Sequence, residues 1–155
     1  LFNSGMRPAV NVGLSVSRVG GAAQAKAMKK AAGSVRIDLA QYREMEVFTQ
    51  FSSDLDAITK EQLEYGKRLM ELLKQPLSEP LSLHAQVITL CAATHKLFLD
   101  VPVKELKKFQ KDMLAYLDQK HPQIGEEIEE LHSLSDTLIN KIIDAVKEYK
   151  SQVVK

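Results

Sequence analysis

The stretch MKKAAGSVRIDLAQY, residues 28–42, decides the fold class. Its apolar residues recur at intervals of three and four, which is the stripe of an amphipathic α-helix. They are Met28, Ala31, Val35, Leu39 and Tyr42. Gly33 interrupts the stripe at a cost of about 1 kcal/mol, so it marks a bend or a close contact. We expect one helix from about Ala22 to the polar residues 52–56.

Helical periodicity continues to the end of the chain. Thr59 and Gln62 have the spacing of a capping box and predict the start of a second helix. Prolines end or open the helices that follow. The four further helices span approximately residues 59–75, 82–99, 102–120 and, after His121-Pro122, 126–149. The sequence therefore predicts a mainly α-helical fold, a bundle of about five helices joined by short loops.

The first 21 residues follow a different pattern. Val10, Val12 and Val16 stand at alternate positions, and glycines surround them. This pattern is typical of a short strand followed by a glycine-rich loop. We therefore expect the helical bundle to be preceded by a short strand and loop of a β-containing domain.

Arg18 is the single fixed positive charge in the Gly/Ser-rich part of this segment. Arginine stays charged at any physiological pH, and its forked donors match the geometry of phosphate oxygens. An ordinary surface arginine in a loop is the alternative interpretation.

Composition describes an ordinary globular protein with an uneven charge distribution. Of its 155 residues, 45% are hydrophobic and 26% charged, which suffices for one domain with a core. The first 37 residues carry six basic and no acidic side chains, whereas residues 38–155 carry 15 basic and 20 acidic ones. Such a basic end favours a nucleotide phosphate or an acidic partner. Nucleic acid is disfavoured because no aromatic residues are interleaved with these charges.

Several other features limit the possible functions. The single cysteine, Cys91, excludes an internal disulfide, and its apolar neighbours favour a packed side chain over a reactive thiol. No apolar run is long enough to cross a bilayer. The sequence starts without Met and without the pattern of a signal peptide, so we expect a piece of a longer protein.

Catalysis by this chain alone is not expected. It lacks a Gly-x-x-x-x-Gly-Lys-Ser/Thr phosphate loop. His84 and His95, eleven residues apart, would lie about 16 Å apart on a helix and cannot share a metal ion. His121 and His132 add no metal-binding spacing. Asp54 and Asp56 have no nucleophile or cation nearby in sequence, and we interpret them as an exposed acidic loop.

Pro8-Ala9-Val10-Asn11, followed by Ser15-x-Ser17, resembles the signature shared by the alpha and beta subunits of rotary ATP synthases. Asn11 and the run from Arg18 to Gln24 favour the alpha side. The resemblance continues in the same order through residues 39–44, 50–56 and 71–75. The sequence is thus identified as similar to the C-terminal portion of an F-type ATP synthase alpha subunit. An archaeal or vacuolar-type B subunit fits residues 13–20 less well.

The resemblance implies a division into two parts. Residues 1–24 would form the C-terminal end of a nucleotide-binding domain, with the strand and the loop that carries Arg18. Residues 25–155 would form the C-terminal α-helical domain.

The resemblance also implies specific roles for six residues. Arg18 would be an arginine finger that acts in trans at the catalytic ATP site of a neighbouring beta subunit, with Ser15 and Ser17 shaping its loop. Arg7, Pro8 and Gln75 would form the pocket around the adenine of a nucleotide that the alpha subunit itself holds. Leu77 stands where the family often has a second glutamine, which leaves a domain-packing role open for Arg7 and Gln75.

The wider implications concern the assembly. ATP or ADP with Mg would be bound in the full complex and by no site of this chain alone, and no metal site is expected within it. Three alpha and three beta subunits would form a helical collar around a gamma-type stalk, with Asp54-Leu55-Asp56 facing the stalk.

The expected complex is a proton- or sodium-driven, H+-transporting two-sector ATPase, peripheral to a membrane. Its place would be the cytoplasmic face of a bacterial plasma membrane, or an organellar inner or thylakoid membrane in a eukaryote. A stand-alone helical interaction module, whose basic N-terminal segment docks an acidic partner, is the alternative.

Overall fold

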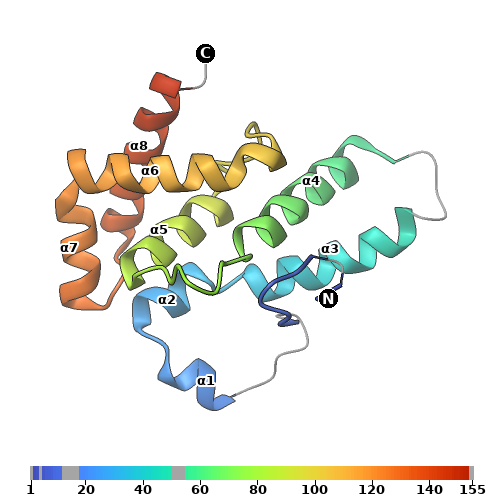
Figure 1. Cartoon of the computed structure of the whole chain (residues 1–155), viewed down its shortest axis with the longest axis horizontal. Helices are drawn as coiled ribbons and strands as arrows, with labels where there is room; N and C mark the ends of the chain where they lie inside the picture. Colours follow the sequence, from blue (N-terminus) through green and yellow to red (C-terminus); the bar gives the residue numbers. More distant parts are fainter. Residues whose placement is uncertain (1, 4, 12–17, 50–54, 154–155) are drawn as a thin grey trace.

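A computed structural model describes residues 2–3, 5–11, 18–49 and 55–153, and Figure 1 shows their arrangement. These residues form helices and turns, without a strand among them. The mainly α-helical fold class is confirmed. The elements in order are α1 (Arg18–Ala23), α2 (Lys26–Ala31), α3 (Val35–Thr49), α4 (Ala57–Leu72), α5 (Leu83–Thr94), the 3-10 helix η1 (Val103–Glu105), α6 (Leu106–Lys120), α7 (Pro122–Leu131) and α8 (Asp136–Val153).

Helix α5 is the centre of the core. It contacts α2, α4, α6, α7 and α8, and seven of its twelve residues are buried. A helix that is apolar on most sides is stable only when neighbours cover it on most sides. Ala85, Ala92 and Ala93 keep its surface narrow, so these neighbours can approach closely.

Helices α3 and α4 form an antiparallel hairpin that projects to one side of the molecule (Figure 1). Their contact depends on Gly66, which faces the ring of Tyr42. A Cβ atom at Gly66 would lie 2.3 Å from two ring carbons of Tyr42. Only glycine therefore allows the two helices to pack this closely.

Two of the five expected helices are each divided in two. The expected bend at Gly33 is confirmed, but residues 32–34 form a turn that separates α2 from α3. Likewise, His132 ends α7 with a left-handed backbone, at φ 50°, and the Ser135 hydroxyl accepts a hydrogen bond from the Leu138 amide at the start of α8. Periodicity missed this break because Leu131, Leu134 and Leu138 continue the spacing across it.

Two predicted helix ends were wrong. The Asp56 carboxylate caps α4 by accepting a 2.6 Å hydrogen bond from the Thr59 amide, so the cap lies three residues before the expected capping box. Helix α5 ends at Thr94 rather than near Leu99. Lys96 has a φ of 58°, and the Leu97 amide bonds back to Ala92, which is the six-residue closure that ends many helices.

The expected loop at Arg18 was also wrong in part. Residues 18–23 form the short helix α1, and the ammonium of Lys29 donates to the Ala22 carbonyl at its C-terminal end. A cation at this end satisfies a carbonyl that has no partner within the helix. Residues 12–17, which hold most of the predicted strand and both loop serines, lie outside the described residues.

Candidate functional site

Arg7, Pro8 and Gln75, which the family resemblance assigned to one pocket, lie together. The backbone N–H of Gln75 donates a 2.9 Å hydrogen bond to the backbone carbonyl of Arg7. The Arg7-Pro8 peptide is cis, and the Arg7 guanidinium carbon lies 4.4 Å from the centre of the Phe2 ring. Such a position over an aromatic face is favourable for a cation.

These residues form one wall of an open groove of about 1450 Å³. The other walls come from the connection between α4 and α5 and from α6. Its apolar lining includes Pro8, Ala9, Pro76, Leu77, Pro80, Leu81 and Leu114. Charged side chains at the groove include Arg7, Glu71, Lys74, Glu79, Lys107 and Lys111. Grooves that combine apolar walls with polar groups are typical of sites for organic ligands.

The N-terminal segment is attached to the bundle at two further points. Met6 is only 4% exposed, and the Arg43 guanidinium on α3 donates to the Asn11 side chain. Together with the Gln75–Arg7 bond, these contacts place residues 6–11 against the helices.

Lys107 is a site residue that sequence reasoning missed. Its ammonium donates to the Leu72 carbonyl at 2.9 Å and to the Lys74 carbonyl, so it caps the C-terminal end of α4. Burial lowers the pKa of Lys107, and the nearby carboxylate of Glu71 partly opposes this effect. Nothing in the sequence marks it, because its partners are backbone carbonyls of another helix.

Arg18 is the first residue of α1, and its side chain lies outside the described structure. Ser15 and Ser17 lie outside it as well. The other residues of α1 are exposed, with Val19 at 80%. The predicted arginine finger therefore stays a prediction.

The end of the hairpin where α3 leads into α4 carries Leu55 and Asp56, while Asp54 lies outside the described residues. The hydrogen bond from the Thr59 backbone holds the pKa of the Asp56 carboxyl below its usual value. Asp56 thus has a structural role in addition to any contact with a partner. Three apolar side chains at the same end are exposed: Val47 by 57%, Phe48 by 70% and Ile58 by 72%. Because they lie outside the apolar stripe that faces the core, the sequence could have indicated a contact surface here.

Two of the histidines lie beside carboxylates, and the cysteine is packed in the core. His84 lies 2.8 Å from Glu129, and His121 lies 3.0 Å from Glu148. Burial raises the pKa of the Cys91 thiol to about 11, as expected for a packed side chain. No group of three metal-binding side chains is present in residues 2–3, 5–11, 18–49 and 55–153.

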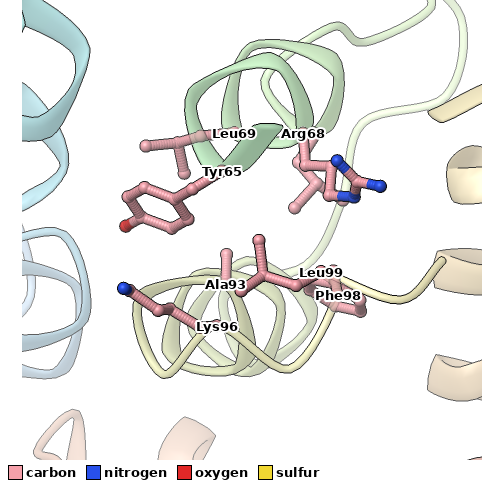
Figure 2. Close-up of a pocket in the computed structure, with 8 residues that line it drawn as sticks. Tyr65, Arg68, Leu69, Ala93, Lys96, Phe98 and Leu99 are labelled. Atoms are coloured by element: carbon pink, nitrogen blue, oxygen red, sulfur yellow. The ribbon is translucent and has the colours of Figure 1, made fainter. Parts of the chain in front are cut away.

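A second pocket lies between α4 and the end of α5, and Figure 2 shows its side chains facing one another. Tyr65, Arg68 and Leu69 lie on one side, with Ala93 and Lys96 opposite them. Its volume of about 10 Å³ leaves room for one water at most. It is a packing defect and not a ligand site.

Comparison with known proteins finds the same family along nearly all of the sequence. Residues 24–149 match the family described as ATP synthase alpha/beta chain, C terminal domain. The protein is 52% identical over 150 residues to ATP synthase subunit alpha of Clostridium kluyveri, covering 97% of this chain and 30% of that protein. It is 50% identical over 154 residues to the protein of the same name from Aquifex aeolicus, covering 99% and 31%.

The same comparison finds 52% identity over 155 residues to ATP synthase subunit alpha of Acetivibrio thermocellus, covering 100% of this chain and 31% of that protein. The chain therefore spans about a third of the length of these relatives. Among the described helices, none is both long and apolar enough to cross a membrane.

Proposed function

This chain belongs to the family of C-terminal domains of ATP synthase alpha and beta subunits, and from that premise we propose that it works within an alpha subunit of a proton- or sodium-driven rotary ATP synthase. Identity of 50–52% to alpha subunits over nearly all of its length is the observation that carries this proposal. In this role residues 1–24 end the nucleotide-binding domain and residues 25–155 form the helical domain.

Arg18 supplies the chemistry in this proposal. Phosphoryl transfer is accelerated by neutralising the charge that spreads over the transferred phosphoryl oxygens. An arginine provided by a neighbouring subunit contributes a factor of about 10³ to 10⁵. Arg18 would reach the catalytic site of an adjacent beta subunit, where ATP is bound with Mg.

The groove provides the second part of the proposal. Arg7, Pro8 and Gln75 would contact the adenine of a non-catalytic ATP or ADP held by the alpha subunit. Apolar walls and the nearby guanidinium of Arg7 favour a purine over a metal ion. Leu77, which is fully exposed at this groove, offers additional apolar surface in place of a second glutamine.

The α3–α4 hairpin provides the third part. Its exposed Val47, Phe48 and Ile58 support a contact with a gamma-type central stalk, because apolar side chains grouped on a surface favour association. The helical domain would join five others, from alpha and beta subunits, in a collar around this stalk. The complex would be peripheral to the membrane, on the cytoplasmic face in a bacterium.

Substitution of Arg18 in the assembled enzyme tests the central claim. Arg18→Ala removes the charge, and Arg18→Lys keeps the charge without the forked donors. We expect steady-state ATP turnover to fall by about 10³-fold or more in Arg18→Ala, while nucleotide affinity at the catalytic site changes much less. Arg36→Ala, on an exposed arginine of α3, is the matched control and should keep normal turnover. Normal turnover in Arg18→Ala would exclude the arginine-finger role.

A further inference from the structure

The peptide unit between Lys74 and Gln75 is held from both sides. Its carbonyl oxygen, on Lys74, accepts a hydrogen bond from the Lys107 ammonium of α6. Its N–H group, on Gln75, donates to the Arg7 carbonyl at 2.9 Å. One peptide plane therefore connects the helical bundle to the segment that carries Arg7 and Pro8.

Lys107 is itself fixed by the core. Its ammonium lies 2.9 Å from the Leu72 carbonyl and 3.3 Å from the side-chain oxygen of Gln110. Gln110 is 4% exposed and donates a 3.1 Å hydrogen bond to Thr89, which is 3% exposed on α5. This buried series of hydrogen bonds determines where the ammonium lies, and hence where the Lys74 carbonyl lies.

The charge of Lys107 also strengthens the bond on the other side of the peptide. Hydrogen bonds from charged donors are roughly twice as strong as neutral ones. A carbonyl polarised by an ammonium makes the N–H of the same peptide a better donor. The Gln75–Arg7 bond thus depends on Lys107, whose ammonium donates to the Leu72 and Lys74 carbonyls and to the Gln110 side chain.

We propose that Lys107 is the positioning residue for Arg7, Pro8 and Gln75. It fixes the peptide that anchors Arg7, and in this way sets the spacing of the two sides of the groove. The consequence for ligand binding rests on the proposed role of these three residues around adenine. The positioning itself does not depend on that role.

Amide hydrogen exchange on the 155-residue protein tests the positioning directly. Lys107→Met keeps roughly the length of the side chain without its charge. In this variant we expect the backbone amide hydrogen of Gln75 to exchange about tenfold faster. The amide of Val146, in the core of α8, should change by less than about twofold, since it reports global unfolding. Lys107→Arg should restore slow exchange at Gln75, because a guanidinium can donate to the same carbonyls.

Lys108→Met is the matched control. This neighbouring lysine also lines the groove, but its side chain is 83% exposed and forms an ion pair with Asp112 on its own helix, so its loss should leave Gln75 exchange unchanged. An unchanged Gln75 amide in Lys107→Met would overturn the proposal. Equal acceleration at Gln75 and Val146 would also overturn it, since Lys107 would then only stabilise the fold.

ATP binding to the non-catalytic sites of the full complex separates this proposal from the proposed function. We expect Lys107→Met to weaken ATP there by about tenfold, while turnover at saturating ATP stays within about twofold. If Gln75 exchange responds as expected but the unsubstituted complex binds no ATP at these sites, the adenine role fails and the positioning stands. If ATP affinity is unaffected while Gln75 exchange accelerates, Lys107 does not position the ligand-binding groups.

Discussion

His132 has a backbone conformation that is unfavourable for a residue with a side chain. It ends α7 in the left-handed region, at φ 50°, where a side chain with a Cβ costs about 1–2 kcal/mol. The position is retained because the His132 carbonyl accepts a 2.9 Å hydrogen bond from the Ala27 amide. Ala25, at the start of α2, has no side-chain group that could cap this helix, so the carbonyl of His132 caps it instead.

Replacing this residue by glycine should therefore stabilise the protein. His132→Gly removes the steric cost and keeps the carbonyl, so we expect the free energy of unfolding to rise by about 0.5–1 kcal/mol. Urea denaturation measures this change. His132→Ala keeps the Cβ and the left-handed backbone and should show no gain, which makes it the control. A gain of equal size in both variants would place the effect in the imidazole and not in the backbone.

At the scale of elements, the α3–α4 hairpin depends on the close approach of its two helices at Gly66 and Tyr42. Glycine in a helix interior costs about 1 kcal/mol relative to alanine, so its presence at position 66 needs a reason. The ring of Tyr42 supplies that reason, because it occupies the space that a Cβ would need.

Gly66→Ala should destabilise the fold despite the better helix propensity of alanine. We expect a net loss of about 1–3 kcal/mol, because the clash at 2.3 Å forces α3 and α4 apart. Gly33→Ala is the matched control, since its Cβ would meet the nearest atoms at an ordinary 3.5 Å. Thermal unfolding of both variants gives the comparison, and a Gly66→Ala protein as stable as Gly33→Ala would contradict the contact.

Helices were easier to predict from sequence than their ends. Periodicity located the helical segments because burial of an apolar stripe dominates their energetics. It could not show that α7 stops at Leu131, since the leucine spacing continues through residues 132–135. The carbonyl of His132 and the left-handed Lys96 act through backbone geometry, which leaves little trace in residue types.

At the scale of the whole molecule, surface carboxylates link stability to pH. The His84 backbone amide, followed by its side chain, lowers the pKa of Glu129. The Tyr116 hydroxyl, followed by His121, lowers the pKa of Glu148. Each carboxyl releases its proton more readily in the folded protein, so the unfolded protein takes up protons first as the pH falls.

Stability should therefore decrease as the pH falls below the usual glutamate pKa of 4.5. Urea midpoints between pH 7 and pH 3 measure the decrease. The double variant Glu129→Gln/Glu148→Gln should show a shallower decrease, and added salt should act in the same direction because these pairs are exposed. Glu130→Gln, on an exposed neighbour, is the control. A double variant with the slope of the unsubstituted protein would argue against these two pairs.

The candidate site was only partly accessible from sequence. Arg7, Pro8 and Gln75 were grouped by their resemblance to a family motif, and the structure brings them together. Lys107 could not be found in this way, because the sequence does not distinguish Lys107 from Lys108 or Lys111, and only the fold shows which of them reaches a carbonyl. Arg18 stays a prediction, since its destination would lie on another subunit.

The bond between Ala27 and His132 has a consequence for the order in which the protein is made. During translation, α2 is complete about a hundred residues before His132, whose carbonyl caps this helix, is added to the chain. Asp136, the ion-pair partner of Lys30, is added about as late. Contacts between distant parts of a polypeptide form late because the loop between them must first be closed. The α3–α4 hairpin can pack as soon as it leaves the ribosome, whereas α2, synthesised earlier, packs on α5 later and receives its N-terminal cap only when His132 has been added.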